Sequence, residues 1–124
     1  MANSEVNPGD NILKTISKLV GASGFEGTDN YFDFDVLVSI NTFILDLYQN
    51  GIGQPNFVVT EDTTWADYLG EQLSQLQAVK MYLYLQTKLA IDPPASVSTQ
   101  QSYKDMAERV LIRLREQVEC ENTL

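Results

Sequence analysis

The chain has 124 residues, of which 44% are hydrophobic and 20% charged, a composition typical of one small globular domain. Its formal net charge of −9 disfavours binding to nucleic-acid phosphates, which depends on Lys and Arg. Histidine is absent, which excludes Ser-His-Asp, Cys-His and His-based metal chemistry within one chain. No apolar run approaches the ~20 residues of a membrane span. The single cysteine, Cys120, cannot form an internal disulfide, which suits a reducing cytoplasm.

The first predicted elements are a flexible N-terminal arm at residues 1–10 and a helix from about Asn11 to Val20. The arm is polar and has no basic region followed by an apolar block, so it does not resemble a signal peptide. Asp10 is the expected N-cap of the helix, and Gly21 is its expected C-cap. The loop that follows is rich in Gly, Ser, Thr, Asp and Asn, as loops are.

The second helix is predicted to start after Asp33 or Asp35 and to end near Gln49, where Asn50 and Gly51 follow. Both acids suit a helix N-terminus through capping and the helix dipole. The helix looks apolar enough to be central in the fold. Its apolar stripe consists of Val36, Ile40, Phe43, Ile44 and Leu47.

The segment Phe57 to Thr60 is either one short strand or an extended loop. A lone strand needs a partner for its backbone groups, and the sequence contains no second strand signal. Edge pairing with another subunit would supply such a partner. The alternative, which we favour, is an extended loop that packs Phe57 onto the helices.

A short helix carrying Trp65 and ending at Gly70 is expected next, capped by residues 62–64. The third long helix is predicted from about Leu73 to Ile91, because Pro93 and Pro94 cannot continue it. Its apolar stripe consists of Leu76, Val79, Leu83 and Ala90, widened by Tyr82, Leu85 and Leu89.

The last helix is predicted to run to about Glu119, with Ser98 and Gln101 as a capping box at its start. Its apolar stripe consists of Tyr103, Met106, Val110, Leu114 and Val118, with Ala107 and Leu111 beside it. Residues 120–124 are predicted to form a flexible tail. The predicted fold is therefore all-α, a small bundle of about four helices in one domain (residues 11–119), with one short extended segment.

The charges are unevenly distributed along the chain. Between Leu19 and Val79 there are nine acids and no Lys or Arg, whereas the remaining residues hold eight acids and eight bases. Asp29, Asp33 and Asp35 do not have the spacing of a calcium loop, and capping already explains the last two, so we expect no metal site. Neither a catalytic pair nor a cofactor is indicated, and we expect no enzyme activity.

A basic side of the last helix and the acidic middle of the chain suggest charge-complementary contact between identical subunits arranged head to tail. Solvated helix faces are the simpler explanation for each residue taken singly, and core packing is the simpler explanation for the only tryptophan. The candidates for the subunit interface are Trp65, Lys80, Tyr84, Lys88, Arg109 and Arg113.

Five segments in this order resemble the head–tail connector (adaptor) proteins of tailed bacteriophages, over about residues 12–114. They are Asp33-Phe34-Asp35, Ile40-Asn41-x-x-Ile44 with Phe43, Gln49-Asn50-Gly51-Ile52-Gly53, Trp65-x-Asp67-Tyr68-Leu69, and the helix Val79-Lys80-x-Tyr82-x-Tyr84-Leu85 that ends in Asp92-Pro93-Pro94.

The resemblance implies a structural virion protein at the head–tail interface, assembled in the host cytoplasm. It would form a ring, twelve-fold in the virion, that binds the portal protein, extends the DNA channel and offers a platform to the next neck or tail protein. Viral DNA would pass through without specific binding, and no membrane is involved. The candidates for acids on the channel wall are Glu26, Asp29, Glu61, Asp62 and Glu71.

Two other functions remain open from the sequence. One is a related role at the same neck, as a stopper or tail-completion protein. The other is of a different class, an acidic helical protein that binds and antagonises a basic cellular partner.

Overall fold

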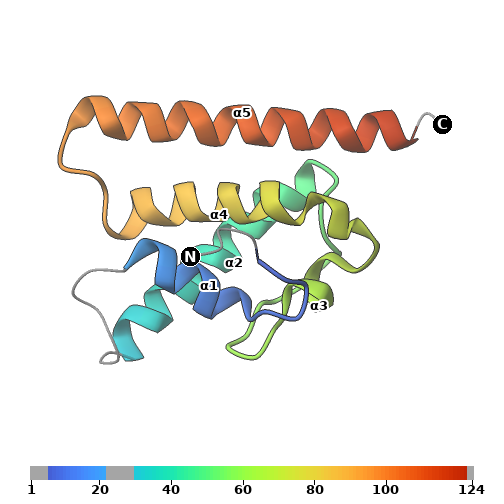
Figure 1. Ribbon diagram of the computed structural model, residues 1–124, viewed down its shortest axis with the longest axis horizontal. Helices are drawn as coiled ribbons and strands as arrows, with labels where there is room; N and C mark the ends of the chain where they lie inside the picture. The colour runs from blue at the N-terminus through green and yellow to red at the C-terminus, as the bar shows by residue number, and fades with distance from the viewer. Residues whose placement is uncertain (1–5, 22–29, 123–124) are drawn as a thin grey trace.

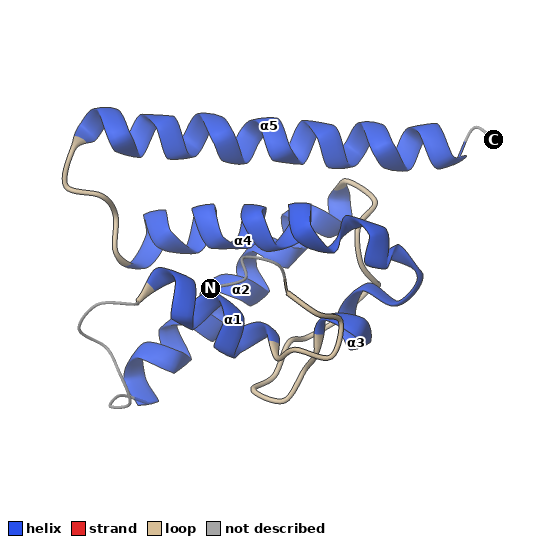
Figure 2. Ribbon diagram, viewed as in Figure 1, coloured by secondary structure: helices blue, strands red, loops and turns tan. Residues whose placement is uncertain are grey.

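The computed structural model describes residues 6–21 and 30–122, and these residues form helices and loops without a strand (Figure 2). The prediction of an all-α fold is confirmed. The helices are α1 (Ile12–Val20), α2 (Asn30–Gln49), α3 (Trp65–Leu69), the 3-10 helix η1 (Gly70–Gln75), α4 (Leu76–Ile91) and α5 (Val97–Asn122).

Helix α4 is the centre of the fold. It packs against α1 and α2 on one side and against α5 on the other, and α5 runs along the edge of the molecule (Figure 1). The prediction that the second helix is central is therefore wrong. Helix α4 takes that place because apolar side chains point from it in two directions.

The two tyrosines of α4 show this double packing. Tyr82 is buried on the α2 side, where its hydroxyl lies 3.4 Å from the Oδ2 atom of Asp46. Tyr84 is half-buried on the α5 side, with its ring centroid 6.3 Å from that of Tyr103. The two rings point to opposite sides of α4, and both are packed because helices lie on both sides.

One hydrophobic core joins the helices. The predicted stripes supply most of it, although Ala90 and Met106 are exposed and several stripe residues, Phe43 among them, are only half-buried. The core members with essentially no accessible surface include Ile12 and Ile16 from α1, Val36, Ile40 and Leu47 from α2, and Val79, Leu83 and Leu85 from α4.

Asn11, not Asp10, caps α1. The Oδ1 atom of Asn11 accepts a hydrogen bond of 2.9 Å from the backbone N–H of Lys14. The carboxylate of Asp10 instead accepts from the N–H of Asn7 at 2.9 Å and closes the preceding turn. The predicted C-cap, Gly21, is confirmed.

The starts of α2 and α5 also differ from the prediction. Helix α2 begins at Asn30, so Asp33 and Asp35 lie inside it, where they cannot act as its N-cap. Helix α5 begins at Val97, and the hydroxyl of Ser96 accepts from the N–H of Thr99 at 3.3 Å. Ser98 therefore lies within the helix, and the predicted capping box is wrong.

The short helix follows the prediction closely. Thr64 and Asp67 form a reciprocal capping box at the start of α3. Gly70 ends the helix with a φ of +52°, a conformation that glycine adopts without a Cβ penalty. The six-residue 3-10 helix η1 then separates α3 from α4, so α4 starts slightly later than expected.

Replacing Leu83 by Ala should lower the free energy of unfolding by about 2–5 kcal/mol, because the side chain is fully buried in α4 and its loss leaves a cavity. Thermal or urea unfolding measures the effect. The matched control is Leu45→Ala on α2, where the side chain is 61% exposed and little should change in the single chain. Equal unfolding curves for the two variants would contradict the core described above.

Candidate interaction surfaces

Helix α2 carries a second apolar stripe on the side that faces away from the core. Phe34, Val38, Leu45 and Tyr48 recur at helical spacing, out of phase with the buried residues. All four are exposed, Phe34 by 64% and Leu45 by 61%. A helix that is apolar on both sides usually has a partner on both sides. The outer side of α2 is therefore a candidate contact surface.

The segment 57–61 runs beside this stripe, and the side chain of Asn41 holds its middle. The Oδ1 atom of Asn41 accepts from the N–H of Val59 at 2.8 Å, and its Nδ2 atom donates to the C=O of Val59 at 3.0 Å. The amide thus satisfies both backbone groups of Val59, as a neighbouring strand would. The favoured alternative, an extended loop, is the one observed.

Together the helix and the segment form a groove, which we call the α2 groove. It encloses about 560 Å³, and Glu61 is the only ionisable residue among those that line it. Val58 projects from the segment with 65% of its surface exposed. The apolar part of its lining comprises Phe34, Leu37, Val38, Leu45, Val58 and Val59. The groove therefore offers an apolar floor with an acidic edge.

The α2 groove is not evident from the sequence. Phe34, Val38 and Leu45 have helical spacing, but a second apolar stripe is equally expected of a helix at the centre of a fold. In the sequence Asn41 belongs only to a motif of the connector resemblance. Its role depends on a loop that lies far along the chain, which spacing alone does not reveal.

Three of the predicted interface residues are used within the chain. Trp65 is 0% exposed, and its indole Nε1 donates to the hydroxyl of Thr15 at 3.3 Å. Its side chain therefore packs in the core, which was the simpler explanation for this tryptophan. Lys80 is also buried. Tyr84 packs on Tyr103, and burial raises the pKa of its hydroxyl to about 12.

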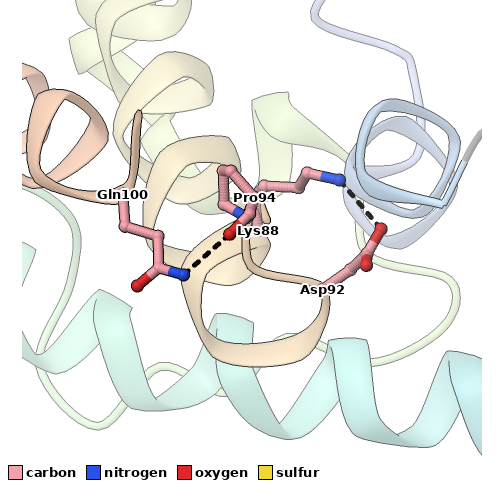
Figure 3. Close-up of polar contacts among 4 residues, drawn as sticks. All are labelled: Lys88, Asp92, Pro94 and Gln100. Carbon is pink, nitrogen blue, oxygen red and sulfur yellow. Dashed lines mark hydrogen bonds and ion pairs between the residues drawn. The ribbon is translucent and has the colours of Figure 1, made fainter. Parts of the chain in front are cut away.

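Lys88 belongs to the connection between α4 and α5. Its Nζ atom lies 2.8 Å from the Oδ2 atom of Asp92, the residue that ends α4 (Figure 3). Beyond the turn, the Nε2 atom of Gln100 donates to the C=O of Pro94 at 2.7 Å (Figure 3). The first contact lies at the C-terminal end of α4, and the second ties the start of α5 to the connecting turn.

Arg109 and Arg113 are exposed on α5. With Met106, which is 44% exposed, they follow one another by three and then four residues and so share one face of the helix. We call these three residues the Arg109 face. Neither guanidinium forms an ion pair with a side chain in the described part of the chain.

The candidate channel acids are dispersed. Glu26 and Asp29 lie outside the described residues. Glu61 borders the α2 groove, Asp62 follows it in a turn closed by Thr63, and Glu71 lies in η1; all three acids are exposed. Within residues 6–21 and 30–122 no three acidic or cysteine side chains are grouped as a metal site would require. None of the helices described there is long and apolar enough to cross a membrane.

Replacing Asn41 by Ala should destabilise the chain by about 1–3 kcal/mol, because the buried backbone groups of Val59 lose both partners. Hydrogen exchange should also become faster at the amide of Val59. Thr42→Ala is the control, since Thr42 is exposed and its hydroxyl only donates to the C=O of Val38 within the helix. Unchanged exchange at Val59 would show that Asn41 does not hold the segment.

The comparison with protein families gives one match. The family described as phage connector protein matches residues 12–121. No curated protein and no solved structure matches the chain significantly. The match covers every helix of the described fold apart from the last residue of α5. The chain therefore belongs to the phage connector protein family, and its role is that of a structural connector of the phage particle.

Proposed function

We propose that the protein is a head–tail adaptor that forms a ring beneath the portal protein, extends the DNA channel and provides the docking platform for the next neck or tail protein. Membership of the connector family supports a place among the virion proteins. The observation that supports a ring is that one small chain exposes two different surfaces, the α2 groove and the Arg109 face.

Two unlike surfaces favour a ring over a closed dimer. A two-fold dimer uses the same patch on both copies, whereas head-to-tail contact uses two different patches and closes by rotation. Helix α4 lies between α5 and the α1–α2 pair. Each copy therefore has room for one neighbour on either side, and we propose a ring of twelve copies.

The acids that remain outside the groove are suited to the channel wall. Acidic side chains repel a passing duplex within a Debye length of about 8 Å, whereas Lys and Arg would hold its phosphates. Glu71 is exposed and does not line the groove, so it is the best candidate among the described acids. Glu26 and Asp29, which lie outside the described residues, stay candidates from the sequence. Glu61 and Asp62 lie at the groove, where a protein contact is the more direct use.

Co-expression with the portal protein of the same phage tests the proposal. We expect the two proteins to purify together, and the native mass of the complex should correspond to one ring of this chain on one portal. The chain mixed with an unrelated ring-forming protein is the control. If the chain does not bind the portal but binds the tail or a stopper, the result would contradict the adaptor proposal. It would instead support the related role of a stopper or tail-completion protein.

A second experiment addresses the channel. Replacing Glu71, Glu26 and Asp29 together by Lys should leave the ring on the portal intact but slow DNA ejection, because the duplex then meets phosphate-binding cations. The charge-matched control is Lys at Asp105, Glu108 and Glu116, which are exposed on α5. Equal ejection rates for intact particles of both variants would remove these acids from the channel wall.

A further inference from the structure

We propose that the α2 groove binds the Arg109 face of a second copy of this chain. The inference rests on the proposed ring, and it names the two surfaces that meet between neighbouring subunits. It assigns the floor of the contact to α2 of one copy and the inserted side chains to α5 of the next.

The groove has the composition of a contact surface. Its apolar floor is formed by large side chains at helical spacing, with Phe34, Leu45 and Val58 each more than half exposed. Single exposed apolar residues are common on proteins, but a contiguous hollowed patch indicates a binding partner. The segment that forms its second wall is fixed by Asn41, so the groove is already shaped before a partner arrives.

The charge of the groove indicates which kind of partner surface it can bind. Glu61 lines it and Asp62 follows, and no Lys or Arg occurs anywhere between Leu19 and Val79. The groove lining therefore presents apolar side chains, three neutral polar side chains and one carboxylate to a partner, and no cation. The complementary surface must combine cations with apolar side chains.

The Arg109 face of α5 has that combination. Met106 can enter an apolar floor, and the aliphatic stems of Arg109 and Arg113 can lie along it while their guanidinium groups reach the carboxylates of Glu61 and Asp62. Of the acids of α5, spacing places Glu108 and Glu119 on a different side of the helix from this face. Asp105 and Glu116 lie next to the arginines on the side away from Met106.

Both surfaces belong to one chain but do not meet within it, because α5 packs mainly on α4 and the groove lies on the side of α2 that faces away from the core. The contact must therefore join two copies. Since the two patches differ, each copy keeps a free groove at one end and a free Arg109 face at the other, which continues the assembly until it closes.

Disulfide trapping on the portal complex tests the contact. One chain carries Leu45→Cys and another, distinguishable by mass, carries Met106→Cys, both with Cys120→Ser to remove the exposed native thiol. We expect mild oxidation to link the first chain to the second. Each variant alone should give no covalent dimer. Ile112→Cys, on a different side of α5, replaces Met106→Cys in the control and should also fail to link.

Charge reversal gives an independent measurement. Glu61→Arg with Asp62→Arg should reduce assembly, as should Arg109→Glu with Arg113→Glu, and the four changes combined in one chain should restore it. All four residues are exposed, so the thermal melts of the variants should match the parent. Rings on the portal without the Leu45–Met106 link, or unaffected by either reversal, would overturn this contact and leave the adaptor proposal standing. A parent chain that forms no ring contradicts the adaptor proposal itself, and the same trapping in concentrated free chain then decides the contact.

Discussion

The fold depends on the burial of α4 from two sides. Val79, Leu83 and Leu85 have almost no accessible surface, and the two tyrosines beside them point to opposite layers. This arrangement lets one short helix organise α1, α2 and α5 at once. Because α4 already fills the centre, α2 lies at the side, and only one of its two apolar stripes is covered. The exposed groove is thus a direct consequence of how the core is built.

Helix α5 is attached mainly to α4, which leaves most of its circumference available for contacts. Its start is fixed by the contact of Gln100 with Pro94 and its end by the packing of Val118 near Gly51. Gly51 has a φ of +93°, and a Cβ there would lie 2.7 Å from a methyl group of Val118, so only glycine allows this close approach. A helix held at both ends and along one stripe can present a rigid charged face to a neighbour.

Much of the fold could be predicted from the sequence, because apolar spacing, prolines and glycines determine where the helices lie and end. The positions of α1, α3 and α4 followed from these signals to within a few residues, and the Pro93-Pro94 stop placed the end of α4. Helix starts were less predictable, because two neighbouring residues can cap each helix equally well. The candidates are Asp10 and Asn11 for α1 and Ser96 and Ser98 for α5, and the course of the chain in the folded structure decides which residue is the cap. The groove could not be predicted, because it requires the loop at Val59 to reach Asn41. Of the predicted interface residues, Arg109 and Arg113 are exposed, whereas Trp65 is buried.

A structure of the assembled neck at side-chain resolution tests the central claim most directly. The proposed arrangement predicts a ring under the portal in which Leu45 of each copy touches Met106 of the next, with Arg109 and Arg113 close to the neighbour's Glu61 and Asp62. The outer side of α2 should lose most of its accessible surface in that ring. A ring whose subunits meet elsewhere, with Phe34, Leu45 and Val58 still facing solvent, would contradict it.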